Sequence, residues 1–418
     1  MTTIKEPGRT IPVAAEYDVL VVGGGMAGVA AGIAAARHGV RVCLIERYCG
    51  VGGLATLGNV TIWLPICDGM GHQVIAGMGE ELLRLSVSDL GDEYKAAQWR
   101  SIPECWQPGG DLRQRVEHRF SSRFNPASYM LALEKLVVDA GVHVLYDTRF
   151  CNVRREGDRI THVILENKDG RSALAGKVIL DTSGDADVCN ASGEATVSSD
   201  SNVLCGWFYT LSDGEVTLHQ LSHRYDPMAA REHATGPFFK GDVADDVTQQ
   251  ILQTRASLRD MLARIRAEQS GRDVQLIMPA TMACFRMSRR LVGRGTVQGS
   301  DVHKWTETAI GLTGDWRRCG PVFAIPFESM CPVRTCNLLA AGRCISVDNT
   351  AWDVLRAIPA CVVTGQAAGT AAAMACATTG GRMGDLSVSD LQADLLDQGV
   401  LIKRSLLAEH RRRADIPR

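Results

Sequence analysis

The chain has 418 residues, of which 45% are hydrophobic, and its 45 lysines and arginines nearly balance 47 aspartates and glutamates. A disordered chain is excluded, because disorder combines low hydrophobicity with a large net charge. We also expect no nucleic-acid partner, since a net charge of −2 leaves no basic excess to bind a phosphate backbone.

The first predicted elements form a β-α-β unit. Residues 17–22 have the apolar character of a short buried strand, and the glycine-rich segment 23–28 follows directly. Residues 30–38 continue as a helix of small side chains that ends at the next glycine. Residues 40–45 form the second predicted strand, with Glu46 at its end.

The glycine-rich segment has the spacing G-x-G-x-x-G, formed by Gly23, Gly25 and Gly28. The first glycine permits a tight turn, the second lets backbone approach a diphosphate, and the third lets the helix pack on the strand. The free N–H groups at the helix N-terminus attract phosphate. Glu46 is placed to accept hydrogen bonds from ribose hydroxyls. The glycines alone fit a structural turn, but strand, helix and acidic residue together predict dinucleotide binding.

Helices and a β-meander are predicted next. Residues 78–85 form one helix, and residues 125–139 form another, with Asn125 as N-cap and Pro126 at its first position. Short alternating segments separated by turn residues then predict a β-meander that returns to a buried strand; they are residues 142–146, 151–155, 160–166 and 177–180.

Two apolar segments lie near the C-terminal end. Residues 337–341 predict a buried strand, and residues 358–377 predict a long helix of small side chains. This helix is interrupted by Gln366, so we expect no membrane span, which needs roughly 18 uncharged apolar residues. The first sixteen residues also lack the apolar core of a signal peptide.

The chain has 14 cysteines, and several of them, such as Cys43, Cys361 and Cys376, lie in apolar stretches. Reduced thiols behave there as small hydrophobes, whereas a disulfide framework is typical of small secreted chains. No cysteine and histidine spacing suits a metal ion, so no metal site is expected. These features predict a soluble, cytoplasmic protein.

Three further motifs have plain interpretations. Residues 293–299 are glycine-rich but have the spacing G-x-G-x-x-x-G, which favours a turn over a second nucleotide loop. Cys331 and Cys336 have the spacing of a redox pair but are expected to be structural thiols. His72 follows a loop that we expect near the cofactor, yet a lone histidine is more often a satisfied polar residue.

Gly52 and Gly53 follow Glu46 closely, and the N-terminal unit extended in this way resembles the FAD-containing flavoproteins of the glutathione reductase and succinate dehydrogenase type. Residues 178–188 resemble the second cofactor segment of that family, and residues 337–370 resemble its C-terminal segment. The resemblance is strongest to the bacterial group known only as FAD-dependent oxidoreductases, which extends to heterodisulfide reductase A-like flavoproteins.

The resemblance implies FAD as the cofactor and assigns its contacts to residues spread over the chain. In this family the helix N-terminus of the C-terminal segment closes over the flavin, so residues 365–368 are expected to stabilise negative charge on the reduced ring. The implied cofactor-binding residues are Gly23, Gly25, Met26, Ala27, Gly28, Glu46, Arg47, Gly52, Gly53, Leu54, Ala55, Thr56, Phe150, Ser183, Gly184, Asp185, Gly342, Arg343, Gly365, Gln366, Ala367 and Ala368.

The predicted fold class is α/β. A Rossmann-like FAD-binding domain, made of the β-α-β unit and the β-meander, is accompanied by a second, α+β substrate domain. The FAD-binding domain is expected to be discontinuous, comprising residues 15–200 and 320–380. Residues 201–319, with contributions from 57–120, are expected to cover the flavin, and residues 381–418 to form a helical tail.

The function that follows is an FAD-dependent oxidoreductase that transfers a hydride between a small organic substrate and the flavin N5. An FAD monooxygenase is an alternative, because residues 183–185 also resemble the second FAD motif of aromatic hydroxylases. An electron-transfer flavoprotein without its own substrate is another, although the sequence has no cysteine-rich iron–sulfur run. The substrate, the proton-transfer residue and assembly into a homo-oligomer are left open.

The expected catalytic residues are Arg286, Arg289 and Arg356. The first two follow a strand-like stretch in the expected substrate domain and match an Arg-x-x-Arg pattern of the related flavoproteins. Arginine suits this place because its planar fork holds a carboxylate in a fixed orientation at any working pH. An alternative of equal weight is that these two side chains, with Arg290 and Arg294, form ion pairs that hold the two domains together.

Overall fold

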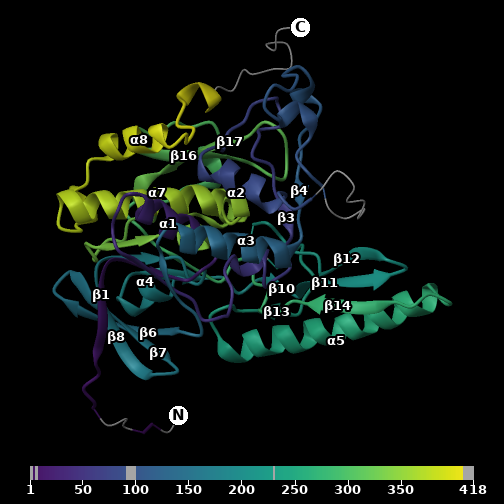
Figure 1. The fold of residues 1–418 in the computed structure, drawn as a ribbon, viewed down its shortest axis with the longest axis horizontal. Helices are drawn as coiled ribbons and strands as arrows, with labels where there is room; N and C mark the ends of the chain where they lie inside the picture. Colours follow the sequence, from purple (N-terminus) through teal and green to yellow (C-terminus); the bar gives the residue numbers. More distant parts are fainter. Residues whose placement is uncertain (1–2, 5–7, 91–99, 229–230, 408–418) are drawn as a thin grey trace.

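The computed structural model describes residues 3–4, 8–90, 100–228 and 231–407. Its centre is a seven-stranded sheet in the order β5-β2-β1-β8-β7-β6, with β18 paired to β8 (Figure 1). The strands are β1 (Val13–Val22), β2 (Val42–Ile45), β5 (His143–Leu145), β6 (Arg149–Glu156), β7 (Arg159–Asn167), β8 (Gly170–Asp181) and β18 (Leu338–Ala340).

Strand β8 joins the two halves of this sheet. Its first part pairs antiparallel with β7, which pairs antiparallel with β6, whereas residues 179–181 pair parallel with β18. Strand β1 lies parallel to both β8 and β2, and β5 lies parallel to β2. The predicted Rossmann-like unit with its β-meander is confirmed. The assignment of residues 142–146 to the meander is wrong, because helix α3 (Pro126–Asp139) carries the chain to the parallel edge.

Both faces of the sheet are buried, as expected for parallel strands. Val19, Val21 and Leu44 pack in the larger core, together with helices α1 (Met26–Arg37) and α7 (Ile358–Thr378). The side chains that alternate with them, such as Leu20, Val22 and Cys43, pack in a second core with the meander and α4 (Asp187–Ala191). Helix α3 begins as predicted, with the Asn125 side chain accepting from the N–H groups of Ala127 and Ser128.

A second, smaller sheet lies beside the first. Its order is β12-β11-β14, all antiparallel, and the long helix α5 runs along it (Figure 1). Phe208, Leu221 and Leu258 form the core between this sheet and the helix. The elements are β11 (Cys205–Ser212), β12 (Glu215–Ser222), β14 (Gln275–Pro279) and α5 (Ala244–Glu268).

The chain then returns to the larger core. The hairpin of β16 (Ala309–Gly314) and β17 (Val322–Pro326) packs through Ile310 and Ile325 in the core of α7, and α8 (Val388–Asp397) contacts both α7 and β16. Residues 408–418 of the predicted tail lie outside the described residues. The remaining helices and strands are α2 (Met78–Ser86), α6 (Asn349–Leu355), β3 (Ile62–Trp63), β4 (Ser122–Arg123), β9 (Thr196–Ser198), β10 (Asn202–Val203), β13 (Phe238–Phe239) and β15 (Arg289–Leu291).

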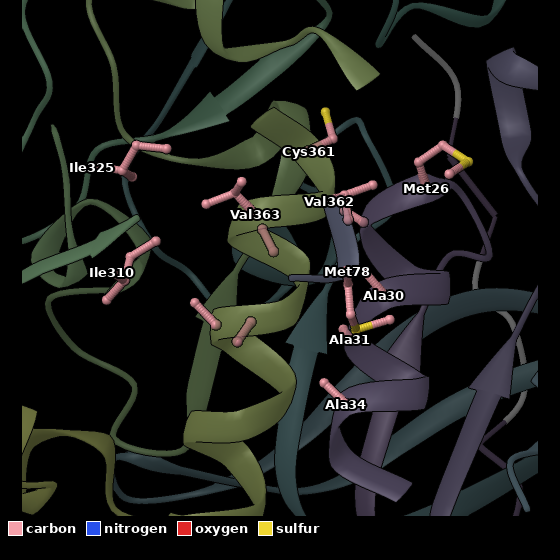
Figure 2. Close-up of a cluster of buried hydrophobic side chains, with 14 of the residues drawn as sticks. Met26, Ala30, Ala31, Ala34, Met78, Ile310, Ile325, Cys361, Val362 and Val363 are labelled. Carbon is pink, nitrogen blue, oxygen red and sulfur yellow. The ribbon is translucent and has the colours of Figure 1, made fainter. Parts of the chain in front are cut away.

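Helices α1 and α7 are in backbone contact. A Cβ atom on Gly365 would lie 2.3 Å from the carbonyl oxygen of Ala27, and one on Gly369 would lie 2.2 Å from that of Ala31. Figure 2 shows the two helices side by side, with small alanine side chains of α1 at their contact. Within the described part of the chain, α7 alone is long and apolar enough to cross a membrane, but 83% of its most apolar window is buried. Packing in the core therefore accounts for its composition.

The contact between α1 and α7 predicts opposite effects for two glycine-to-alanine changes. Gly369→Ala forces the helices apart, and we expect it to lower the free energy of unfolding by about 1–3 kcal/mol. Gly32→Ala on α1 is the matched control, because its Cβ would meet the Leu44 side chain at 3.6 Å, an ordinary contact. Alanine is the better helix former, so the control should gain up to about 1 kcal/mol. Urea unfolding of both variants measures this, and equal effects would contradict it.

Candidate functional site

A groove lies at the carboxyl ends of the parallel strands. Val22 and Ile45 end β1 and β2, Thr182 and Ala341 follow β8 and β18, and all four line the groove. The groove encloses about 1110 Å³, including space open to solvent. It lies along the loops that follow β1, β2, β8 and β18, which is where open α/β sheets bind their ligands.

Most of the predicted cofactor residues border this groove. They come from the glycine-rich loop, from the segment after β2, from β6, from the segment after β8 and from the segment before α6. Those that line it are Gly23, Gly25, Met26, Ala27, Glu46, Arg47, Gly52, Gly53, Leu54, Ala55, Phe150, Ser183, Gly184, Gly342 and Arg343.

The first turn of α1 forms a cradle of free backbone groups. Gly25 is the N-cap of this helix, and no side chain caps its N–H groups. A Cβ atom on Gly25 would meet nothing within 4 Å, so the backbone faces open space. The second glycine loop lies against the first, since the Gly52 N–H donates to the Gly24 carbonyl oxygen at 2.8 Å. Uncapped N–H groups at a helix N-terminus suit a diphosphate.

Glu46 is buried in the groove wall, with 7% of its surface exposed. Its carboxylate accepts from the Gly24 N–H at 2.6 Å and from the Tyr48 N–H at 2.9 Å. Burial raises the pKa of Glu46, and these two hydrogen bonds oppose that rise. The carboxylate therefore fixes the glycine loop, and its position in the groove wall suits an acceptor for ribose hydroxyls.

Three predicted cofactor residues lie behind the groove wall. A Cβ atom on Gly28 would lie 1.8 Å from the Gly23 carbonyl oxygen, so this glycine lets α1 pack against the loop. The Thr56 hydroxyl donates to the Val51 carbonyl oxygen at 2.5 Å. Asp185 pairs with two groove arginines, Arg47 and Arg343, each at 3.6 Å.

The expected helix N-terminus at residues 365–368 is wrong. Helix α7 begins at Ile358, and Ile358 and Cys361 line the groove. The residues assigned to the flavin lie further along the helix, where Gly365 contacts α1. Gln366 caps α2 by accepting from the Met78 N–H at 3.0 Å, while Ala367 and Ala368 are fully buried.

The two arginines of the Arg-x-x-Arg pattern have different partners. The Arg289 guanidinium donates to the Asp187 carboxylate at 2.8 Å and to the Asp185 carbonyl oxygen at 2.9 Å, with Asp242 at 3.8 Å. Arg289 therefore joins the loop after β8 to the segment that leads into α5. This arrangement favours the ion-pair interpretation for Arg289.

Arg286 lies over the ring of Tyr225, with its guanidinium carbon 4.2 Å from the ring centroid. Arg356 lines the groove and approaches the same phenol, with its Nη2 atom 3.4 Å from the Tyr225 hydroxyl. Arg356 also pairs with the buried carboxylate of Asp353 through Nε at 3.0 Å. The structure thus brings two of the three expected catalytic arginines together around one tyrosine.

The sequence interpretation missed two residues, Asp187 in the groove and Tyr225 beside the groove-lining Arg356. Asp187 lines the groove, and burial together with the neighbouring Asp185 and Asp181 raises its pKa to about 6, although Arg289 and Arg47 oppose this rise. The sequence did contain a signal for Asp187, because this residue lies within the second cofactor segment, residues 178–188. Tyr225 follows β12 in a stretch without a recognisable motif, so no local signal marked it.

Of the cysteines and His72, Cys361 alone is among the described residues that line the groove. All 14 cysteines are free, and burial raises the pKa of the Cys331 thiol to about 12, consistent with a structural residue. His72 is bound through Nδ1 to the buried Asp68 at 2.9 Å. No cluster that could hold a metal ion occurs within the described ranges.

Comparison with known families identifies the cofactor that the groove binds. The model of the FAD-dependent oxidoreductase family matches residues 18–203 and 248–395, which include the glycine loops, both later cofactor segments and the arginines around Tyr225. The chain belongs to the FAD-dependent oxidoreductase family. FAD is accordingly the cofactor of this enzyme, and the uncapped α1 N-terminus and the buried Glu46 in the groove wall fit it.

The curated relatives are similar over short segments. A thioredoxin reductase from Ureaplasma parvum is 35% identical over 91 residues, which are 22% of this chain and 28% of the relative. A soluble pyridine nucleotide transhydrogenase from Chromohalobacter salexigens is 33% identical over 105 residues, 25% of this chain and 20% of the relative. The chain thus matches about a quarter of the length of these relatives.

Among solved structures, the chain is similar to a geranylgeranyl bacteriochlorophyll reductase-like protein from Thermoplasma acidophilum. The TM-score is 0.46 at 13% identity, over 94% of this chain and 95% of the other.

Removing the Glu46 carboxylate should weaken FAD binding. We expect Glu46→Ala to raise the Kd for FAD about 10- to 100-fold, the value of one or two hydrogen bonds to a charged group. Glu194→Ala is the matched control, because Glu194 is also buried and also accepts from backbone N–H groups, those of Val333 and Arg334, outside the groove. Fluorescence titration with FAD should show an effect for Glu46 only. Equal Kd changes in both variants would contradict the assignment.

Asp187 should make FAD affinity depend on pH. Its pKa of about 6 means that it becomes negative as the pH rises through that value, and the anion then repels the diphosphate in the same groove. FAD affinity should therefore fall between about pH 5 and pH 8. Asp187→Asn should abolish the fall. Asp242→Asn, which also lies near Arg289 but outside the groove, should retain it. A wild-type Kd that rises toward acid pH would refute this role.

Proposed function

We propose that this enzyme transfers a hydride between a small organic substrate and FAD bound in the groove. The observation that carries the proposal is the composition of one end of the groove. Met282, from the segment after β14 of the smaller sheet, lines the same groove as Arg343, Arg356 and the start of α7. The cofactor groove therefore reaches the second part of the fold, where a substrate has room to meet the cofactor.

The residues of the chain have distinct tasks in this proposal. The α1 N-terminus binds the diphosphate, and Glu46 binds the adenine-side ribose. The uncapped N–H groups at the start of α7 and the guanidinium of Arg356 favour negative charge at the other end of the groove. Bound FAD supplies the redox chemistry by accepting or donating the hydride.

Arg289 has a positioning task. Its hydrogen bonds to Asp185 and Asp187 tie the loop after β8 to β15, which pairs with β9. Because Asp187 borders the groove and Asp185 pairs with Arg47 and Arg343, this arginine maintains the shape of the cofactor site without facing its interior. We therefore place substrate contacts elsewhere.

A narrower kinship, with heterodisulfide reductase A-like flavoproteins, is supported by the likeness of the C-terminal segment to that group. It is compatible with an enzyme that passes electrons to a partner protein. The hydroxylase alternative is supported by the residues 183–185, which border the groove except for Asp185. Both alternatives share the cofactor site and differ in the fate of the electrons.

Anaerobic reduction tests the proposed function. The purified protein should be yellow, and a set of small organic substrates should include one that bleaches the flavin without a partner protein. NAD(P)H should bind weakly or compete with substrate, because the sequence has one credible G-x-G-x-x-G unit and FAD occupies it. Oxygen consumption with a hydroxylated product would contradict the proposed hydride transfer and show that the enzyme is a monooxygenase. Flavin reduction that requires a copurifying protein would also contradict it and show that the protein transfers electrons without a substrate of its own.

A further inference from the structure

We propose that Arg286, Tyr225 and Arg356 form a recognition site for a carboxylate group on the substrate, next to the end of the groove lined by Arg356. The inference rests on the proposed function, because it concerns the substrate of the same groove. It starts from a shared contact. The three side chains come from separate segments: the stretch between β14 and β15, the loop after β12, and the end of α6.

The side chain of Tyr225 contacts two arginines, Arg286 and Arg356. Arg286 lies over the ring at 4.2 Å, and Arg356 lies at 5.8 Å from the same centroid, with Nη2 near the hydroxyl. Two positive charges packed against the same partly buried ring repel each other unless nearby anions compensate them. Whether the protein compensates these two charges depends on the carboxylates that lie near each arginine.

Arg356 is compensated and Arg286 is not. Asp353, with no exposed surface, pairs with Arg356 and lies 3.4 Å from Arg317, which is itself bound to Asp315. For Arg286, no carboxylate lies within ion-pair distance among the residues that the structure describes. Its one side-chain hydrogen bond goes to the neutral Ser222 hydroxyl, at 2.6 Å.

The nearby thiols do not supply the missing negative charge. Burial raises the pKa of the thiols of Cys205 and Cys284 above its usual range, although the charge of Arg286 opposes the rise in both. Both are therefore neutral at working pH. The charge of Arg286 is therefore not compensated by these groups, and the cluster keeps a net positive charge that suits an anionic ligand.

The unused donors of Arg286 are open to a ligand. Its Nε and Nη1 atoms have no hydrogen-bond partner within the described structure. Neither atom is fully buried, whereas the unpartnered Nε of Arg290 is. Nη2 keeps a second N–H beside the one donated to Ser222, and with the neighbouring Nε–H or Nη1–H it presents two parallel donors that match the two oxygens of a carboxylate. The planar fork of the guanidinium matches the planar carboxylate group.

Arg343 connects this cluster to the cofactor groove. It lines the groove, and its Nη1 atom donates to the carbonyl oxygens of Phe285 at 2.8 Å and Arg286 at 3.3 Å. The backbone that carries Arg286 is thus fixed to the groove wall. An anion held by Arg286 near Arg356 keeps the rest of the substrate directed toward the cofactor.

The test compares carboxylates with neutral amides of the same shape. FAD-loaded protein is titrated with acetate against acetamide and with benzoate against benzamide, by calorimetry and by the shift of the visible flavin band. At least one carboxylate should bind at least about tenfold more tightly than its amide. Equal binding of both members in both pairs, or no binding of either carboxylate, would overturn the proposal.

Variants locate the site. Arg286→Gln should lose about tenfold in carboxylate affinity and keep its FAD content, whereas Arg224→Gln, an exposed arginine near Tyr225 in the same loop, should bind like the wild type. Undiminished carboxylate binding by Arg286→Gln would overturn the proposal. Flavin absorbance is read in every sample. A colourless wild type would refute the proposed function, whereas a yellow wild type without carboxylate preference would refute this inference alone.

Discussion

Helix α1 is held at backbone-contact distance on two sides, and the cofactor groove depends on this double contact. On one side Gly28 meets the carbonyl oxygen of Gly23, where a Cβ atom would lie at 1.8 Å. On the other side Gly365 meets Ala27 at a distance that also excludes any Cβ atom. The first turn of α1 cannot move without breaking one of these contacts. Its uncapped N–H groups therefore stay open to the groove.

The same contact determines the position of α7. Ala27 faces Gly365 and Ala31 faces Gly369, so the two helices run parallel, and α7 begins before the level of α1. The N-terminus of α7 consequently reaches a part of the groove that α1 does not. Two helix N-termini border one groove, and both favour negative charge there. This suits a cofactor with a diphosphate near one of them and a ring that gains negative charge near the other.

Charged side chains divide the groove region into two parts. Near the loop after β8, the carboxylates of Asp185 and Asp187 are matched by Arg47, Arg289 and Arg343, so the charges largely compensate each other. Around Tyr225, the compensation among the described residues stops at Asp353 and Asp315. A protein that tolerates an uncompensated cation beside its cofactor groove is arranged for an anionic ligand. We therefore propose that cofactor retention and substrate choice depend on different arginines, although Arg286 and Arg289 share one short motif.

The sequence by itself determined the β-α-β unit, the start of α3 and most of the cofactor wall, because local periodicity, capping residues and glycine spacing act over a few neighbouring residues. It did not separate Arg286 from Arg289, since their difference lies in partners far along the chain. The prediction for residues 365–368 was wrong for the same reason, because in the sequence a glycine that allows helix–helix contact cannot be distinguished from one that faces a cofactor. Only the tertiary structure placed Tyr225 between two arginines, because that contact joins three segments that share no local pattern.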